Sequence, residues 1–332
     1  MKIERIEYRD WPEAYSCVVG RVELVVVTSI GPRILSLRLE GGPNLLYEDE
    51  ADFGVGAWRL YGGHRFVTAP ESASTYNPDN EPCDVRVSNG RLLITQPPDT
   101  DGLQKTLTIG PGLPGPGFEI IHGMANRNRR VWHGALWACT CVKPAGRVII
   151  SRPAPTNLGP HHLGALGAWA SAPQELGTPV GNVRFVADGQ GARYWTVAGG
   201  NYAGPTSPQW GWNDGQFVVQ PPLTTGKVGL LSLEGRLTLV RPDLMFSICA
   251  TDVNPRLAYP HGGCNVEIYT SSHYLELETL GALTRLAPGQ EIVHRQAWQF
   301  VPPALNLSEG LKSRQVSERV PLHSKTCQPT HE

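Results

Sequence analysis

Hydrophobic and polar residues alternate with a period of two along much of this chain. Residues 33 to 39 place Ile34, Ser36 and Arg38 on one side and three leucines on the other, an alternation typical of a β-strand. Residues 21 to 28 are rich in β-branched side chains and precede a Gly-Pro turn signal. Further strands are predicted at 84–88, 91–95, 104–109, 118–124, 131–142, 147–151, 183–187, 193–197, 216–219, 228–232, 236–241, 244–250, 264–270, 273–279 and 291–301. Short strands separated by Gly, Pro, Asn and Asp predict an all-β sandwich or barrel.

The length and the C-terminal composition set the expected domain organisation. The chain has 332 residues, which is enough for one large domain or two ordinary ones. No change in composition divides it before residue 300, so we expect a single domain over residues 1–303. Residues 304–332 are polar and lack clear periodicity, and we expect them to form a C-terminal extension that lies on the surface or is disordered.

Charge and cysteine content exclude several classes of protein. The 29 basic and 30 acidic residues nearly cancel, which gives no reason to expect nucleic acid or an anionic membrane as a partner. No stretch approaches the roughly 20 apolar residues of a membrane span, and the N-terminal residues lack a hydrophobic signal region, so we expect a cytoplasmic protein. Seven scattered cysteines form neither a disulfide framework nor a zinc motif. No metal and no cofactor are predicted, and the oligomeric state stays open.

Two acidic strands near the C-terminus carry the first candidate chemistry. Glu276 and Glu278 are two residues apart and therefore share one face of a strand, as do Glu267 and Tyr269 in the segment before it. If these acids face inward, they need partners, and Arg65, Lys227 and His64 are available. If they face water, they need none. Paired carboxylates on one strand face are candidates for general acid or base work.

A second candidate region surrounds the pair Gly62-Gly63, between Tyr61 and the sequence His64-Arg65, with Glu71 shortly after. Glycine permits backbone conformations closed to other residues and allows a ligand to come close. A site containing a histidine, an arginine and an aromatic ring is therefore predicted here. The alternative is a bulged strand end with a surface arginine and a hydrogen-bonded histidine.

A third region is the segment 131–137. If it is one strand, His133 and Trp137 share a face with the small Ala135 between them. Such a surface suits the stacking of a sugar ring, whereas the alternative is a buried tryptophan with a satisfied core histidine. Lys227 precedes an apolar strand and is either a ligand-binding cation or a surface lysine with a packed stem.

The order of these motifs resembles the galactose mutarotase-like superfamily. Gly31-Pro-Arg33-Ile34-Leu-Ser-Leu followed by Asn44-Leu-Leu is similar to its N-terminal strands. The later order of Gly62-Gly63, Pro70, Asn126 and a glutamate strand before Leu286-Ala-Pro-Gly289 is similar as well. The resemblance extends over residues 20 to 301 and implies a large twisted β-supersandwich with a concave face that binds a small-molecule carbohydrate.

The resemblance also implies a reaction. Enzymes of this family interconvert the anomers of an aldose without a cofactor, using a histidine acid at the ring oxygen and a glutamate base at the anomeric hydroxyl. By its distance from Leu286-Ala-Pro-Gly289, Glu278 best matches the base, with Glu276 the close competitor. Trp137 stands at the position nearest to the family's histidine. Indole is not a useful proton donor, which leaves His64 or His133 as the acid.

The leading hypothesis is therefore an aldose 1-epimerase-like isomerase. Its substrate-binding residues would be Tyr61, Arg65, Glu71, Trp137, Lys227 and Glu267. Two alternatives stay open. One is a glycoside hydrolase or lyase on the same fold, and the other is a non-catalytic carbohydrate-binding protein that has lost the acid.

Overall fold

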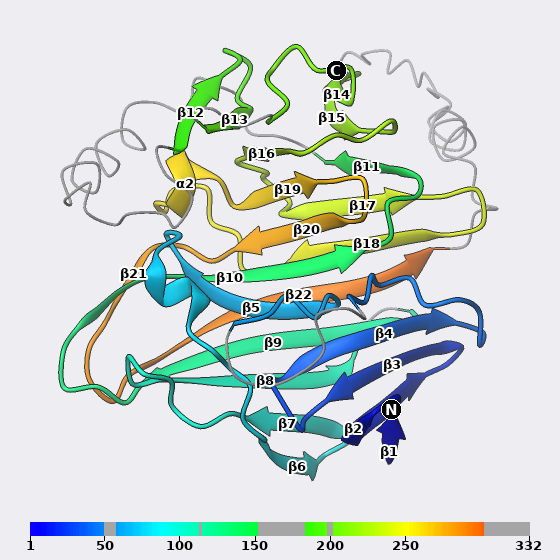
Figure 1. The fold of residues 1–332 in the computed structure, drawn as a ribbon, viewed down its shortest axis with the longest axis vertical. Coiled ribbons are helices and arrows are strands. Elements are labelled where there is room, and N and C mark those ends of the chain that lie inside the picture. Colours follow the sequence, from blue (N-terminus) through cyan, green and yellow to red (C-terminus); the bar gives the residue numbers. More distant parts are fainter. Residues whose placement is uncertain (50–57, 113–114, 152–182, 198–201, 302–332) are drawn as a thin grey trace, which may run out of the picture.

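Strands make up most of the structure. The computed structural model describes residues 1–49, 58–112, 115–151, 183–197 and 202–301. Within these residues the strands form two antiparallel sheets, one of twelve strands and one of ten. Figure 1 shows β10 and β20 crossing the middle of the molecule, with the N-terminal strands at one end.

The twelve-strand sheet carries the site described below. Its spatial order is β1 (Lys2–Tyr8), β2 (Trp11–Val19), β3 (Val22–Val27), β4 (Arg33–Leu39), β5 (His64–Ala69), β10 (Trp132–Val142), β20 (Leu275–Leu280), β19 (Val266–Thr270), β16 (Gly226–Leu230), β13 (Arg193–Val197) and β12 (Val183–Ala187), with β21 (Thr284–Leu286) paired to β10. The ten-strand sheet has the order β14 (Trp210–Asn213), β15 (Gln216–Val219), β11 (Arg147–Ile150), β17 (Arg236–Val240), β18 (Met245–Ala250), β22 (Glu291–Val301), β9 (Gly117–Asn126), β8 (Leu103–Pro111), β7 (Arg91–Thr95) and β6 (Asp84–Ser88).

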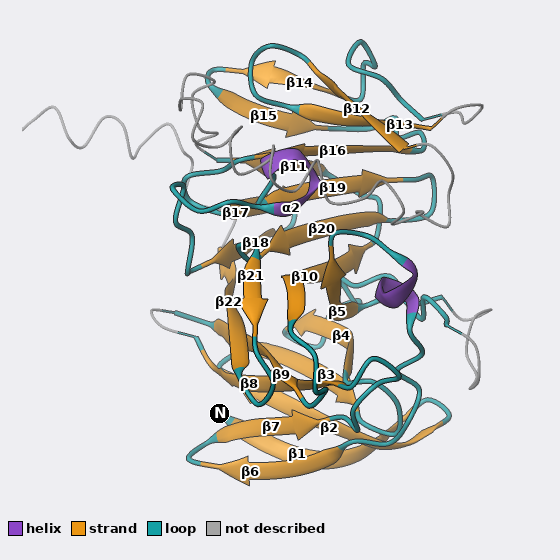
Figure 2. Cartoon of the chain, turned by 90° about the vertical axis from the view of Figure 1, so that its left-hand side faces the viewer, coloured by secondary structure: helices purple, strands orange, loops and turns teal. Residues whose placement is uncertain are grey.

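Helical structure in the described residues is limited to single turns. Figure 2 shows the 3-10 turn η2 (Ala73–Tyr76), which packs beside β5, and the turn α2 (Pro260–Gly263), which precedes β19. Among the described residues, no helix is long and apolar enough to cross a membrane.

The core lies between the two sheets because alternate residues of each strand point inward. Leu277, Ile268 and Val228 stand opposite one another on β20, β19 and β16, and all three are fully buried. They pack in one cluster with side chains of the second sheet such as Ile248 and Trp298. Residues one position away on the same strands therefore point to the opposite face of the sheet.

The predicted all-β sandwich is confirmed, and most predicted strands match observed ones within two residues. The strands that sequence patterns missed include β1, β2 and β5. Strand β1 is an edge strand whose side chains are all partly or fully exposed. It has no buried face, so its sequence lacks a clear alternation of apolar and polar residues. Strand β2 contains Pro12, which cannot donate a backbone hydrogen bond to a neighbouring strand. The predicted extension 304–332 lies outside the described residues.

The glycine pair before β5 has the backbone freedom that was predicted for it. Gly62 and Gly63 have φ values of +80° and +63°. A Cβ atom on Gly63 would lie 2.1 Å from the carbonyl oxygen of Ile34, and one on Gly62 would lie 2.3 Å from that of Tyr47. The groups that come close to these glycines are thus backbone carbonyls, and the pair lets neighbouring segments pack tightly where β5 begins.

Candidate functional site

A cleft of about 220 Å³ lies over the central strands of the twelve-strand sheet. Lys227, Tyr269 and Glu276 line it, and each is next in sequence to an inward-pointing core residue, so the cleft is on the face turned away from the second sheet. The described residues that line it are mostly aromatic or ionisable: Trp58, Leu60, Arg65, Val67, Glu71, Thr75, Tyr76, Trp137, Cys139, Cys141, Trp195, Tyr202, Lys227, Tyr269, Tyr274 and Glu276.

Strand register explains why these residues meet. One row across the sheet joins Arg65 of β5, Cys139 of β10, Glu278 of β20 and Glu267 of β19. The next row joins Cys141, Glu276, Tyr269 and Lys227 on β10, β20, β19 and β16. All of these side chains point to the same face, because they are separated by two residues along each strand.

Lys227 is the centre of a buried ionic cluster beneath the cleft. Its Nζ lies 2.8 Å from Glu278 Oε2 and 3.0 Å from Glu267 Oε2. It also lies 4.3 Å from the ring centroid of Trp137, within the range of a cation–π interaction. Burial alone would lower the pKa of Lys227, but the charges of the nearby glutamates outweigh burial and raise it well above its usual value. Lys227 is therefore a buried, permanently charged group rather than a surface lysine.

The two buried glutamates share this single lysine unequally. Burial would raise the pKa of Glu267, but His261 and Lys227 on either side lower it to about 2. Burial raises the pKa of Glu278 well above 4.5 despite the opposing charge of Lys227, and the charges of Glu267 and Glu276 raise it further. Glu267 thus carries the negative charge of the cluster, and Glu278 is the carboxyl that keeps its proton to higher pH.

His261 connects this cluster to the rim of the cleft. Its Nε2 accepts a hydrogen bond from the backbone N–H of Glu71 at 3.0 Å, so that nitrogen carries no proton. Its Nδ1 lies 2.8 Å from Glu267 Oε1 and is therefore the donor of the pair. The backbone of His261 is in the left-handed region, with φ 51° and ψ 46°, a conformation that costs about 1–2 kcal/mol for a residue with a Cβ. Its two hydrogen bonds hold it there.

Glu276, rather than Glu278, is the strand glutamate that lines the cleft. Glu278 is fully buried, and its Oε2 accepts hydrogen bonds from the indole N–H of Trp137 at 2.6 Å and from Lys227. Glu276 is partly exposed, and its Oε1 accepts a hydrogen bond from the Cys141 thiol at 3.4 Å. Burial raises the pKa of Glu276 above its ordinary value, against the charges of Lys227 and Arg65. A carboxylate with a raised pKa in an aromatic cleft has the properties of a general base.

Glu71 and Tyr76 line the cleft from the segment after β5. The Tyr76 hydroxyl donates a hydrogen bond to Glu71 Oε1. Burial and the charge of Glu71 raise the pKa of Tyr76, so this phenol is a hydrogen-bond donor rather than a proton source. Glu71, Arg65, Trp137 and Lys227, which the sequence analysis assigned to substrate binding, all line this cleft.

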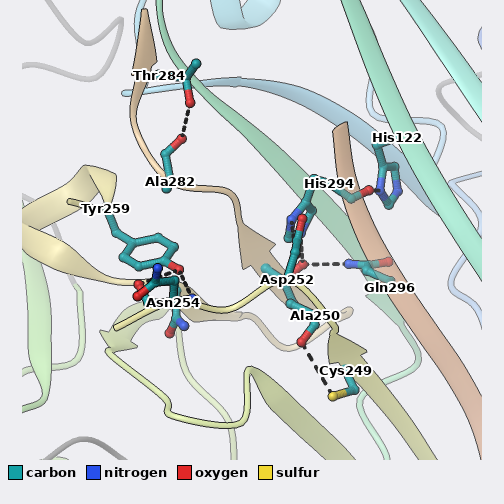
Figure 3. Close-up of polar contacts among 12 residues, drawn as sticks. His122, Cys249, Ala250, Asp252, Asn254, Tyr259, Ala282, Thr284, His294 and Gln296 are labelled. Atoms are coloured by element: carbon teal, nitrogen blue, oxygen red, sulfur yellow. Dashed lines mark hydrogen bonds and ion pairs between the residues drawn. The ribbon is translucent and has the colours of Figure 1, made fainter. Parts of the chain in front are cut away.

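His64, one of the two predicted acids, points away from the cleft. It is fully buried between the sheets, where its Nδ1 lies 2.8 Å from Thr140 Oγ1 and its Nε2 lies 2.8 Å from His122 Nε2. His122 in turn lies 3.0 Å from the carbonyl oxygen of His294, and Figure 3 shows His294 between His122 and Asp252. Burial and His294 lower the pKa of His64 to about 3, which makes His64 part of a neutral polar chain in the core.

Two other predicted residues also lie away from the cleft. His133, the second candidate acid, is exposed near the start of β10, where it pairs with Arg285 of β21. Tyr61 is fully buried in a separate apolar cluster, with its hydroxyl bonded to Asn80 and its ring under Arg33. Glu267 does not line the cleft either, but it forms an ion pair with Lys227, which does. The structure therefore does not bring either predicted histidine to the described part of the cleft.

Several cleft residues were not predicted from the sequence. Trp195 and Tyr202 come from segments with no motif. His261, which contacts the cluster below the cleft, comes from a turn that carried no signal except its Pro-His-Gly-Gly composition. Tyr269 and Tyr274 could have been found, because each lies two residues from a predicted glutamate on the same strand face. Among the described residues, no group of three or more His, Cys, Asp or Glu side chains is arranged to hold a metal ion.

Comparison with known proteins identifies the fold. No protein-family model matches the chain, and no curated protein sequence matches it significantly. Solved structures do match. A protein of Escherichia coli K12 that carries the provisional name aldose 1-epimerase superposes with a TM-score of 0.56 at 11% identity, covering 87% of this chain and 99% of its own.

Two further structures give the same result. A galactose mutarotase-like protein of Lactobacillus casei ATCC 334 has a TM-score of 0.52 at 11% identity and covers 87% of this chain and 100% of its own. The Slr1438 protein of Synechocystis sp. PCC 6803 has a TM-score of 0.52 at 13% identity, covering 90% of this chain and 99% of its own. The resemblance noted in the sequence is thus confirmed at the level of the fold. The chain has the two-sheet β-sandwich fold of the galactose mutarotase-like proteins.

Proposed function

We propose that the cleft binds a carbohydrate about the size of a monosaccharide and that Glu276 acts on it as a general base in an epimerase-type reaction. The observation that carries this proposal is the position of Glu276. It is the strand carboxyl that reaches an aromatic-walled cleft, and burial raises its pKa. Aromatic rings beside a few polar groups are a common design for small-molecule sites.

The proposed reaction opens and recloses the sugar ring. Glu276 accepts the proton of the anomeric hydroxyl, the bond between C1 and the ring oxygen breaks, and the ring oxygen takes up the negative charge as an alkoxide. Rotation about the bond between C1 and C2 followed by the reverse steps gives the other anomer. Every proton that is moved is returned, so no cofactor or co-substrate is needed.

Lys227 is the group that we assign to the ring oxygen. It lies in the same register row as Glu276, two strands away, which is roughly 10 Å between backbones. Its ammonium stays protonated because Glu267 and Glu278 raise its pKa. It therefore stabilises negative charge on the ring oxygen through a charge-assisted hydrogen bond, at the atom to which the sequence analysis had assigned a histidine acid.

Exchange between anomers, followed by NMR over a panel of neutral and acidic aldoses, tests the proposal. The wild-type protein should accelerate exchange of at least one aldose. Glu276→Gln should reduce the acceleration by about a hundredfold or more, as expected for loss of a general base. Glu7→Gln is the matched control, because Glu7 is exposed on the edge strand β1. Full activity in Glu276→Gln would contradict the assignment.

A specific observation supports a second candidate, a carbohydrate-binding protein without catalysis. No histidine is among the described residues that line the cleft. The pKa of Lys227 is raised, and those of the tyrosines Tyr76, Tyr202, Tyr269 and Tyr274 are raised too, so each is a weak acid. Sugar binding by calorimetry with no acceleration of anomer exchange would favour this candidate. A product of altered mass from a glycoside would instead indicate a hydrolase or lyase.

A further inference from the structure

Arg65 is a buried cation at the cleft with unused donors. Its side chain is buried, with the residue only 5% exposed, and it lines the cleft from β5. Nη1 donates to the backbone carbonyl of Arg59 at 3.0 Å. Within the described structure, Nε and Nη2 have no hydrogen-bond partner. Buried donors are nearly always satisfied in native proteins, so two such groups at one cleft indicate a missing acceptor.

The two unused donors are the pair that recognises an oxyanion. Nε–H and the nearer N–H of Nη2 lie parallel along one edge of the planar guanidinium, and this edge binds two oxygens of a carboxylate or phosphate at once. The face of the guanidinium lies 4.9 Å from the ring centroid of Trp58, which fixes its orientation. Trp58 Nε1 is a further buried donor at the cleft that lacks a partner.

Another buried arginine differs from Arg65 in having a carboxylate partner. Arg33 is also fully buried with unused donors, but its charge is compensated by Asp79, to which Nη2 donates a hydrogen bond, and it does not line the cleft. Arg65 has no such carboxylate among its described hydrogen-bond partners. A ligand is therefore the group that completes Arg65.

We propose that the carbohydrate bound in the cleft is a sugar acid, with its carboxylate held bidentately by Arg65. This inference rests on the proposed function, because it names the substrate class of the same cleft. The carboxylate fits better than a phosphate because Arg65 supplies a single positive charge, whereas a phosphate group carries about −1.5 to −2 at neutral pH. Glu71 and Glu276 line the same cleft and would repel the additional negative charge.

Calorimetric titration at low ionic strength tests the sugar-acid assignment. The ligands are glucuronate, galacturonate and mannuronate, with the parent hexoses and the hexose 6-phosphates as matched sets. At least one uronate should bind about tenfold or more tightly than its parent hexose. Arg65→Met should lose more affinity for that uronate than for its neutral parent, so that the advantage disappears. Arg65→Lys keeps the charge but loses the planar fork, and should recover only part of the advantage.

The possible outcomes separate this inference from the proposed function. A parent hexose that binds as tightly as its uronate overturns the sugar-acid assignment and leaves carbohydrate binding intact. A uronate preference that persists in Arg65→Met, or tighter binding of the 6-phosphates, overturns it as well. If no sugar in the panel binds, both proposals fail. Circular dichroism and thermal unfolding of each variant show whether a loss of binding reflects loss of the fold, and Arg65→Lys keeps the test valid if Arg65→Met does not fold.

Discussion

The buried cluster under the cleft makes a sharp prediction about which side chain carries charge. Lys227 Nζ contacts both Glu267 and Glu278, at 3.0 Å and 2.8 Å. Replacing Lys227 with Met keeps most of the apolar stem and removes the cation, which leaves the ionised Glu267 buried. Removing one partner of a buried ion pair costs about 3–5 kcal/mol.

Glu278→Gln provides the contrast. Because burial raises the pKa of Glu278 well above 4.5, we expect this carboxyl to keep its proton to higher pH than Glu267 does. A glutamine has the same shape, and its carbonyl oxygen can still accept from Trp137 and Lys227. The free energy of unfolding should therefore fall by less than about 1 kcal/mol. Urea denaturation at pH 7, followed by tryptophan fluorescence, measures both variants on the same scale.

Glu267 and Glu278 are expected to change the stability of the fold with pH in opposite directions. Glu267 has a lowered pKa, so its contribution to stability is complete above pH 4.5 and is lost as the pH falls toward about 2. Glu278 has a raised pKa, so stability decreases as the pH rises from 4.5 through its folded value. Relative to wild type, Glu278→Gln should thus become more stable as the pH rises. A Glu278→Gln cost as large as that of Lys227→Met at pH 7 would refute this charge assignment.

Four other predictions concern the cleft residues Trp137 and Glu276, the exposed His133 and the glycine before β5. Trp137→Phe removes the indole N–H that donates to Glu278 at 2.6 Å, and should lower the free energy of unfolding by about 1–3 kcal/mol in urea denaturation. His133→Ala should leave sugar binding and anomer exchange unchanged, because His133 is exposed and does not line the cleft; a large loss by NMR would place it in the site. Activity in a pH series should fall as Glu276 is protonated, at a midpoint above 4.5 because burial raises its pKa, and this limb should disappear from any residual activity of Glu276→Gln. Gly63→Ala should reduce stability by at least about 2 kcal/mol, since the added Cβ would lie 2.1 Å from the Ile34 carbonyl oxygen at a φ of +63°; a thermal midpoint equal to that of wild type would show that the backbone can relax.

The period of two along the strands was sufficient to predict the fold class and the shared face of the glutamates. The same rule also explains one error. His64 and Arg65 are consecutive on β5, so they cannot both face the cleft, and their register partners Thr140 and Cys139 confirm the opposite directions. Assigning both to one site conflicted with the geometry of the strand that contains them.

The remaining differences depend on contacts between distant segments. Which of Glu276 and Glu278 lines the cleft depends in part on Trp137, which lies 141 positions away in sequence from Glu278 and donates its indole N–H to that buried carboxyl. His261 reaches the cluster from a turn, and its role depends on the backbone of Glu71, 190 positions away. No local pattern encodes such pairings, because they are fixed by the order of strands in the sheet.

A crystal structure of the protein with a bound uronic acid tests the central claim most directly. We expect the sugar in the cleft, with a hydroxyl group about 2.6–3.2 Å from the Glu276 carboxylate and its own carboxylate on Nε and Nη2 of Arg65. If a neutral sugar binds in this position and the uronic acid does not, the proposed function is supported and the sugar-acid assignment is wrong. A sugar bound elsewhere on the molecule, or one in the cleft that makes no contact with Glu276, would contradict the claim that this cleft and this carboxylate form the site.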